Sequence, residues 1–291
     1  MLVAERLGGE IVGCDALQVY SGLDAATGKP SPELRRRVPH HLVDFADPRL
    51  DFNLADYVRA ADETILGIAA RGSVPIVVGG TGMYLRGLLR GVVDSPARDA
   101  RLRERLRTIA ARRGSSRLHR WLGRLDPASA ARLAPADTQR VVRALELALA
   151  GGGTWSERLL REGTWSSGRE RYASLKVGLD MDRAALAERL AVRVDRFFDA
   201  GLAAEIRSLL ASGVPETANA FKAIGYREVL AALRAGEEAD AAREAVKVST
   251  RRYAKRQRTW FRSEPGIVWA DAGDGPERLA ARIAGLWLGG S

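Results

Sequence analysis

The hydrophobic positions of the chain change period along its length. Two short apolar runs rich in β-branched residues, 10–14 and 75–78, are bounded by glycine or proline and predict buried strands of a parallel sheet. Between them, residues 54–70 carry apolar side chains near helical spacing, after a loop-rich stretch at 21–53. Strand, helix and strand in this order predict a crossover unit of an α/β fold.

The middle of the chain has a different pattern. Residues 99–150 are rich in arginine, alanine and leucine and predict several helices. Asp137 is expected to cap a helix at 138–149, and Gly151–Gly153 to end it. The glycine-, serine- and tryptophan-rich stretch 151–171 predicts a loop.

After this stretch the α/β pattern returns. A strand is predicted at 172–180, followed by helices at 183–199, 201–212, 223–235 and 240–262. We therefore expect an α/β core formed by residues 1–98 and 169–291, interrupted by an all-helical insertion at 99–168.

Composition limits the class of protein. The 291 residues carry a formal net charge of +10, and only five of the 46 basic residues are lysine. An arginine excess suits phosphate contacts and base stacking, but a GC-rich genome would also produce it. No apolar run approaches the roughly 18 to 20 residues that cross a bilayer, and the stretch MLVAERLGGE is not expected to act as a secretory signal. The single cysteine, Cys14, excludes an internal disulfide and fits a cytoplasmic protein.

Two motifs follow the predicted strands, where a doubly wound fold binds its ligands. The first strand leads into Asp15-Ala16-Leu17-Gln18, and the second into Gly79-Gly80-Thr81-Gly82. A carboxylate there can act as a general base or contact a metal, and glycines let backbone amides approach an anion. Alternatively, Asp15 caps a turn and the glycines form a tight bend. Together, at neighbouring strand ends, the motifs favour a phosphate-binding pocket at Gly79, Gly80 and Thr81.

A basic segment gives the strongest signal obtained from the residues alone. Residues 251–262, RRYAKRQRTWFR, contain six basic residues, three aromatic residues and no acid. On a helix, Arg251, Lys255, Arg258 and Arg262 share one face. Most charge runs are solvated faces, but this density with interleaved aromatics favours a nucleic-acid contact.

Other residues have simpler explanations. A second basic helix, Gln139 to Arg143, has the pattern of an ordinary amphipathic helix. His40 and His41 lack a further ligand at metal-binding spacing, so they are expected to cap or pack a loop. Cys14, inside a predicted strand, is expected to be buried and unreactive.

The motifs, taken in order, resemble the bacterial tRNA dimethylallyltransferase family nearly end to end. The matching segments are LGGEIVGCDALQVYSGLD at 7–24, TGKP at 27–30, VPHHLVD at 38–44, VPIVVGGTGMYL at 74–85, DTQRVVRALE at 137–146, RVDRFFDAGL at 193–202, AIGYREV at 223–229 and TRRYAKRQRTWFR at 250–262. The resemblance implies a P-loop-kinase-like parallel sheet core with a helical insertion that binds the anticodon stem-loop of tRNA. It also implies transfer of a dimethylallyl group from dimethylallyl diphosphate to the adenine 3′ of the anticodon, with Mg²⁺ assisting the diphosphate. We expect a monomer without a membrane partner.

The resemblance also implies residue roles. Asp15 matches the carboxylate that accepts the proton of the attacking amine. Ala16, Leu17 and Gln18 lie on the stretch that contacts the target nucleotide, and Thr81 and Arg103 match tRNA-contacting positions. The remaining tRNA-contacting positions are Gln139, Arg140, Val141, Val142, Arg143, Lys222, Ala223, Ile224, Gly225, Tyr226, Arg227, Lys255, Arg256, Gln257, Arg258, Thr259, Trp260, Phe261 and Arg262.

The chain departs from the family pattern at its start. The family begins with a strand and a G-x-T-x-x-G-K-[ST] phosphate loop, and residues 1–7 match the helix after that loop. We expect the first strand and loop to be missing, either because the true start codon lies upstream or because the product is truncated. Ala16 also replaces a serine common in the family.

Three functions stay open on the sequence. The first is a tRNA prenyltransferase, and the second is another P-loop phosphotransferase such as a nucleotide kinase. The third is a non-catalytic RNA-binding remnant, suggested by the missing loop.

Overall fold

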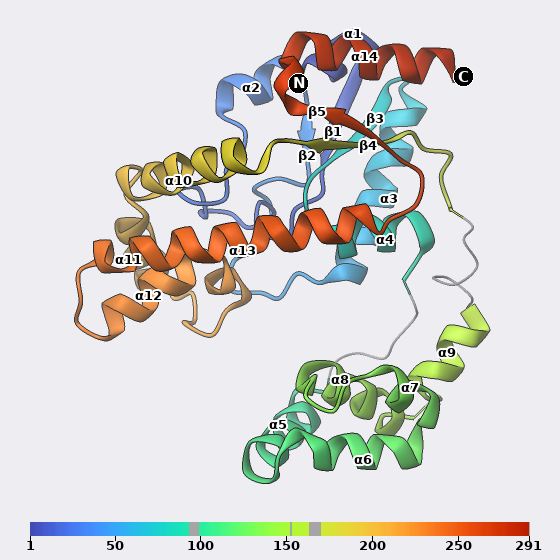
Figure 1. The fold of residues 1–291 in the computed structure, drawn as a ribbon, viewed down its shortest axis with the longest axis vertical. Coiled ribbons are helices and arrows are strands. Elements are labelled where there is room, and N and C mark those ends of the chain that lie inside the picture. The colour runs from blue at the N-terminus through green and yellow to red at the C-terminus, as the bar shows by residue number, and fades with distance from the viewer. Residues whose placement is uncertain (93–98, 152, 163–169, 291) are drawn as a thin grey trace. The chain divides into compact units, whose positions relative to one another are not determined.

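The computed structural model describes residues 1–92, 99–151, 153–162 and 170–290. The chain forms two compact units (Figure 1). The first combines Met1–Leu89 with Tyr172–Ser291, and the second comprises Arg90–Arg171. These limits lie nine and three residues, respectively, from the boundaries expected at 98/99 and 168/169.

The first unit contains two small parallel sheets. The larger has the order β2 (His40–His41), β1 (Gly9–Gly13), β3 (Val74–Val78). Its register pairs Ile11 with His40 on one side and with Ile76 on the other. The smaller pairs β4 (Lys176–Asp180) with β5 (Ile267–Asp271). The α/β class predicted from the sequence is therefore confirmed.

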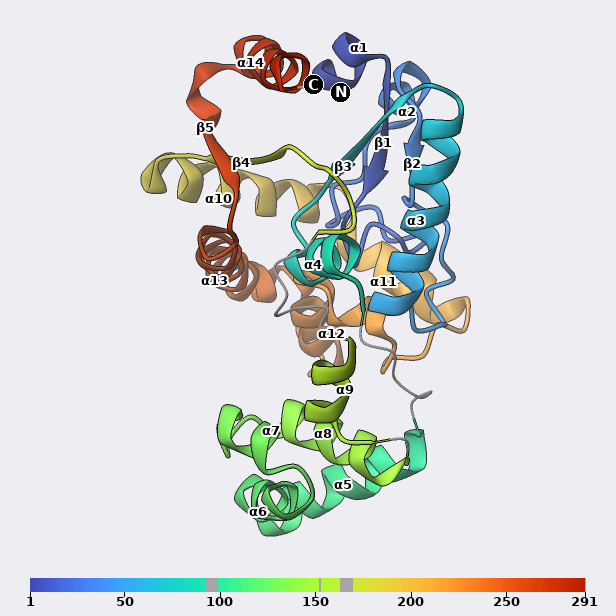
Figure 2. The same cartoon turned by 90° about the vertical axis from the view of Figure 1, so that its right-hand side faces the viewer.

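Helices surround these sheets in the first unit. They are α1 (Leu2–Leu7), α2 (Pro32–Arg37), α3 (Leu54–Ala70), α4 (Gly82–Arg90), α10 (Arg183–Asp199), α11 (Leu202–Ala211), α12 (Tyr226–Arg234), α13 (Arg243–Arg262) and α14 (Pro276–Gly289), with short 3-10 turns η1 (Asn219–Lys222), η2 (Ala239–Ala242) and η3 (Ala272–Asp274). Helix α3 begins at Asn53, whose side chain accepts from the amides of Ala55 and Asp56 in a capping box. Figure 2 shows α3 running alongside β1 and β3.

The main core of the first unit joins the loop after β1 to four helices. Val19, Tyr20 and Leu23 from that loop are fully buried against side chains of α10, α11, α12 and α13. Burial of this apolar surface is the main force that holds the loop in place. The residues that follow the first strand therefore have a fixed backbone.

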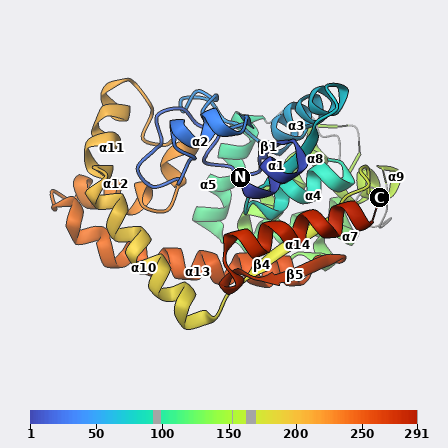
Figure 3. The same cartoon turned by 90° about the horizontal axis from the view of Figure 1, so that it is seen from above.

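The two sheets border an apolar hollow of about 470 Å³ within the first unit. Side chains of β3 and β4 line it, together with Leu88 of α4 and Trp287 of α14. Val78 and Leu179, at the ends of these strands, are more than half exposed. Helices α1 and α14 pack side by side near the two termini of the chain (Figure 3).

The second unit is helical in its described part. Its helices are α5 (Ala100–Arg113), α6 (Ser115–Leu125), α7 (Pro127–Arg132), α8 (Thr138–Leu149) and α9 (Trp155–Glu162). Asp137 caps α8 as predicted, accepting from the amide of Arg140 at 3.2 Å. Leu106, Leu118, Leu122 and Leu145 form its core.

The observed elements differ from the predicted ones in several places. His40 and His41 were expected in a loop, but they form β2 because the edge of β1 binds their backbone. The His41 ring lies 2.6 Å from Glu10, which also pairs with Arg71 at 2.9 Å. The predicted loop at 151–171 contains α9, and residues 163–169 lie outside the described part. Strand β5 and helix α14 were not predicted.

Candidate active site

Asp15 lies just past the end of β1, where the chain turns sharply. Its Oδ1 atom accepts hydrogen bonds from the amides of Leu17 at 2.8 Å and Gln18 at 3.3 Å. No described residue bonds to its second oxygen, Oδ2, and the residue is only partly buried. The turn thus fixes the carboxylate through one oxygen and leaves the other available to a ligand.

The glycine turn, Gly79-Gly80-Thr81-Gly82 after β3, is joined by hydrogen bonds to the segment that contains Asp15. The amide of Ala16 donates to Thr81 Oγ1 at 3.1 Å, and the amide of Thr81 donates to the Cys14 carbonyl at 3.2 Å. A Cβ atom at Gly79 would lie 2.1 Å from that carbonyl oxygen, so only glycine permits the approach. The structure therefore brings Asp15 and Thr81 together, as the two motifs predicted.

One face of α13 closes over the glycine turn. Gln257 Nε2 donates to the Gly80 carbonyl at 3.0 Å. A Cβ atom at Gly82 would lie 2.4 Å from the indole of Trp260, which packs directly on that residue. Of the predicted phosphate-binding positions, Thr81 has its amide and Gly80 its carbonyl engaged within the protein.

Tyr253 is a site residue that the sequence reasoning did not assign. Burial raises the pKa of its phenol, and the nearby Asp15 carboxylate raises it further, whereas hydrogen bonding with Gln257 and Thr81 acts in the opposite direction. The residue keeps 37% of its surface exposed, and its phenol is close enough to Asp15 and Thr81 to interact with both. Its spacing from Gln257, one helical turn, was the available signal.

The basic face of α13 forms a hollow with α10. The four predicted residues, Arg251, Lys255, Arg258 and Arg262, all line a cavity of about 520 Å³, so the prediction that they share a face is confirmed. Asp180 at the end of β4 pairs with Arg258 at 3.0 Å and with Arg262 at 2.8 Å. Half of this face is thus partly neutralised, while Lys255 stays exposed.

The TGKP segment supplies a buried cation near Gln18. The Lys29 side chain is 4% exposed and pairs with Asp24 at 2.7 Å and Asp44 at 2.6 Å. Gln18 Nε2 donates to the carbonyls of Thr27 and Gly28, both at 3.1 Å. Residues 27–30 therefore hold the side chain of Gln18, a predicted nucleotide-contacting residue. The composition of the segment did not indicate this role.

Arg103 and Arg143, predicted tRNA contacts in the second unit, both bind Glu146. Arg143 lies 3.1 Å from its carboxylate, Arg103 donates through Nη2 at 2.5 Å, and the amide of Asp99 donates to Oε1 at 3.1 Å. Burial alone would raise the pKa of Glu146, but the hydrogen bonds from Arg103 and Arg143 lower it below its ordinary value. These arginines therefore have a structural role.

The other predicted contacts on α8 differ in their exposure. Gln139 and Arg140 are exposed, whereas Val141 and Val142 lie in the core of the second unit. The valine side chains are therefore not at the surface, because the apolar face of the amphipathic helix turns inward.

The predicted segment 222–227 has two exposed side chains. Lys222 and Arg227 are exposed, but Ala223 and Tyr226 are buried, and Ile224 is partly buried. Gly225 has φ of 96°, a left-handed conformation that favours glycine. The buried members anchor the turn and the two charged ends face solvent.

The described residues offer neither a metal-binding cluster nor a reactive thiol at this site. Within residues 1–92, 99–151, 153–162 and 170–290, no three or more His, Cys, Asp or Glu side chains are placed to hold a metal. Cys14 is buried as predicted, and burial raises its pKa to about 12, so it is a thiol at neutral pH. No described helix is long and apolar enough to span a bilayer.

The fold and the sequence have counterparts among known proteins. Residues 18–264 match the family model described as IPP transferase. Since this match covers most of the chain, the chain belongs to the IPP transferase family.

Curated relatives carry a more specific name. A tRNA dimethylallyltransferase from Geobacter metallireducens is 43% identical over 285 residues, which cover 98% of this chain and 91% of that protein. One from Anaeromyxobacter dehalogenans (strain 2CP-C) is 46% identical over 288 residues, covering 97% and 92%.

Solved structures have a similar fold. The full-length tRNA isopentenylpyrophosphate transferase of Bacillus halodurans superposes with a TM-score of 0.71 at 33% identity, covering 99% of this chain and 90% of that one. A eukaryotic dimethylallyltransferase acting on tRNA gives a TM-score of 0.77 at 27% identity, covering 93% and 69%.

Proposed function

We propose that this protein transfers the dimethylallyl group of dimethylallyl diphosphate to the exocyclic N6 amine of the adenine 3′ of the anticodon, position 37, in tRNA. The observation that carries the proposal is the Asp15 carboxylate, held by two backbone amides through Oδ1, while no described residue bonds to Oδ2. Membership in the IPP transferase family and the names of the relatives support it.

Asp15 acts as the general base. In the transfer, a bond forms between the adenine nitrogen and the terminal dimethylallyl carbon, while the bond from that carbon to the diphosphate oxygen breaks. The diphosphate leaves with the bonding electrons, and the amine proton passes to Asp15 Oδ2. The adenine amine is a weak nucleophile because its lone pair is delocalised, so a positioned base contributes about 10²–10⁴-fold.

The diphosphate is placed by the turn at Gly79, Gly80 and Thr81 and assisted by Mg²⁺. The described residues offer one carboxylate there, Asp15, and no three-ligand cluster. Because Oδ2 of Asp15 serves as the base, Mg²⁺ would be held by oxygens of the diphosphate and by water, ligands that it commonly takes in phosphate sites. When bound, the ion neutralises charge on the departing diphosphate.

Exposed basic side chains bind the tRNA. The α10–α13 hollow contributes Arg251 and Lys255, and Lys222 and Arg227 lie at the ends of their turn. Phosphate contacts offset the few kcal/mol that extraction of the target base from its stack costs.

A genetic complementation tests the proposal. Deleting the gene should remove N6-dimethylallyladenosine, with its derivatives, from digested cellular tRNA, as measured by mass spectrometry. A copy restored with its own upstream region should return the nucleoside. The same copy carrying Asp15→Asn should return at least about 100-fold less in short-term labelling.

The control is Asp240→Asn, an exposed carboxylate that pairs with Arg243 away from the strand ends. It should restore modification fully. Unchanged modification on deletion would end the proposal, and full activity of Asp15→Asn would remove Asp15 from the mechanism.

A further inference from the structure

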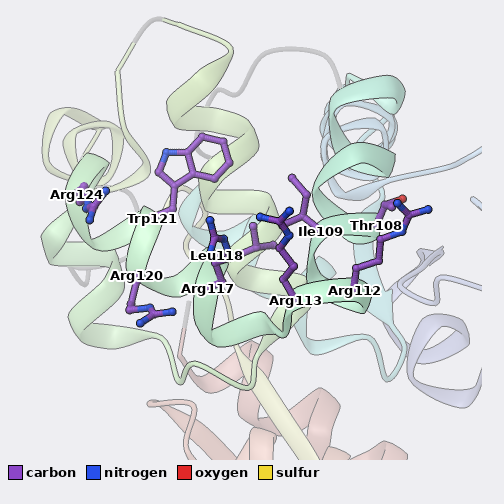
Figure 4. A pocket seen from close by; sticks show the side chains of 9 residues that line it. All are labelled: Thr108, Ile109, Arg112, Arg113, Arg117, Leu118, Arg120, Trp121 and Arg124. Carbon is purple, nitrogen blue, oxygen red and sulfur yellow. The ribbon is translucent and has the colours of Figure 1, made fainter.

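A second basic surface lies in the helical unit and contains none of the residues assigned above. Between Arg105 and Leu125 the chain carries seven arginines and no aspartate or glutamate. Helices α5 and α6 enclose a hollow of about 830 Å³. Five arginines line it with Trp121, and all of the lining side chains come from these two helices (Figure 4).

Within the described part of the chain, these arginines have no carboxylate partners. Among the described residues, no Asp or Glu forms an ion pair with Arg112, Arg113, Arg117, Arg120 or Arg124, and each is exposed. The arginines of α8 differ, because Arg140 pairs with Asp137 and Arg143 with Glu146. Five like charges around one hollow repel each other, so the arrangement is at its most favourable with a polyanion bound.

Helix geometry keeps the arginines on one side of a rigid support. On α6, Arg117, Arg120, Trp121 and Arg124 follow the spacing i, i+3, i+4, i+7 of a single face. Arg117 and Arg124 are therefore about 10 Å apart along the helix axis. Leu118 and Leu122 of the same helix are fully buried in the core of the second unit.

Trp121 adds a flat apolar surface to this charged hollow. Its side chain remains 36% exposed although the neighbouring Leu122 is fully buried. An exposed indole among guanidinium groups can stack on a nucleic-acid base, and stacking does not depend strongly on which base it is. A ligand that combines phosphates and bases fits both features of this surface.

We propose that the α5–α6 surface, formed by Arg112, Arg113, Arg117, Arg120, Trp121 and Arg124, is an additional RNA-binding site. Its arginines contact consecutive phosphates of the substrate RNA, and Trp121 stacks on one of its bases. The site rests on the proposed function, which supplies tRNA as the partner, and extends it to residues that none of the matched motifs contains.

The salt dependence of tRNA binding to the full chain tests the site. The variant Arg117→Gln/Arg120→Gln/Arg124→Gln removes three charges from the hollow. The matched control, Arg36→Gln/Arg207→Gln/Arg278→Gln, removes three exposed charges elsewhere. Fluorescence anisotropy with labelled tRNA gives the dissociation constant at several salt concentrations, and circular dichroism verifies folding.

The hollow variant should bind tRNA about tenfold more weakly. Its slope of log affinity against log salt should fall by about two to three, since each phosphate contact contributes about 0.7 to 0.9. The control should keep the wild-type slope. Equal losses in the two variants, or an unchanged slope in the hollow variant, would overturn the site.

Trp121→Leu tests the stacking part with inorganic polyphosphate as the second ligand. It should weaken tRNA binding about fivefold or more and leave polyphosphate binding unchanged. Equal effects on the two ligands, or no effect on tRNA, would contradict a stacked base. Prenyl transfer is a separate readout: full tRNA binding without transfer would sink the proposed function and leave this site standing.

Discussion

The arginines of α13 and those of α5–α6 form equally dense clusters in the sequence but have different surroundings. On α13, Asp180 pairs with Arg258 and Arg262, while Gln257 and Trp260 on another face contact the glycine turn. On α5–α6, the arginines around the hollow have no described carboxylate partner. The comparison shows that a basic run mixes residues that stabilise the fold with residues available to a ligand.

Glu146→Gln should have the largest effect, because it removes the partner of two arginines in a buried network. We expect the helical unit to lose about 3 kcal/mol of stability. Hydrogen exchange of peptides from α5 and α8, read by mass spectrometry, measures this locally. Arg117→Gln is the control and should change protection by less than about 0.5 kcal/mol.

The same carboxylate predicts a pH dependence. The pKa of Glu146 is lowered in the folded state, so its stabilisation is complete above the unfolded value of about 4.3 and is lost as pH falls through the folded value. The difference between wild type and Glu146→Gln should therefore shrink on acidification below about pH 4. A constant difference down to pH 2 would mean that the charge is not what stabilises the unit.

Gly82→Ala should separate α13 from the glycine turn, because its methyl group would meet the Trp260 ring. Overpacking of this kind costs about 1–3 kcal/mol, which urea unfolding should reveal. Gly285→Ala is the matched control, since nothing lies within 4 Å of its added Cβ atom. A neutral Gly82→Ala would show that α13 does not press on the turn.

Asp180→Asn should release two guanidinium groups and make α13 more like α5–α6. We expect tRNA affinity to rise about threefold at low salt and the gain to disappear at high salt. Asp195→Asn removes the same charge beside Arg243 and Lys247 and should give a smaller gain, because both cations keep a second carboxylate. Equal gains would attribute the effect to net charge alone.

Cys14 should show the smallest response. Because the thiol is 2% exposed and its pKa is raised to about 12, iodoacetamide at pH 8 should label it only after unfolding in urea. Mass spectrometry of the native and unfolded protein measures the difference. Rapid labelling of the native protein would show that the strand end opens readily.

Different parts of the sequence had different predictive value. Periodicity found β1, β3, α3 and α8 closely, because each depends on local spacing and on local signals such as the Asp137 cap. It missed β2, which has only two residues and exists because the edge of β1 binds it. It also missed β5 and α14.

The motifs likewise predicted only some of the site residues. Motifs placed Asp15 and Thr81 at neighbouring strand ends, but not Tyr253 beside them or Asp180 on the basic face. They also assigned Val141 and Val142 to a binding segment without indicating that both are buried.

The sequence by itself determined the family, the α/β alternation and the residue types at the strand ends, because these are properties of neighbouring positions along the chain. The tertiary structure alone decided which charges are paired. Pairing depends on residues far apart in the sequence, such as Asp180 and Arg262, whose separation in space is set by the packing of whole helices and strands.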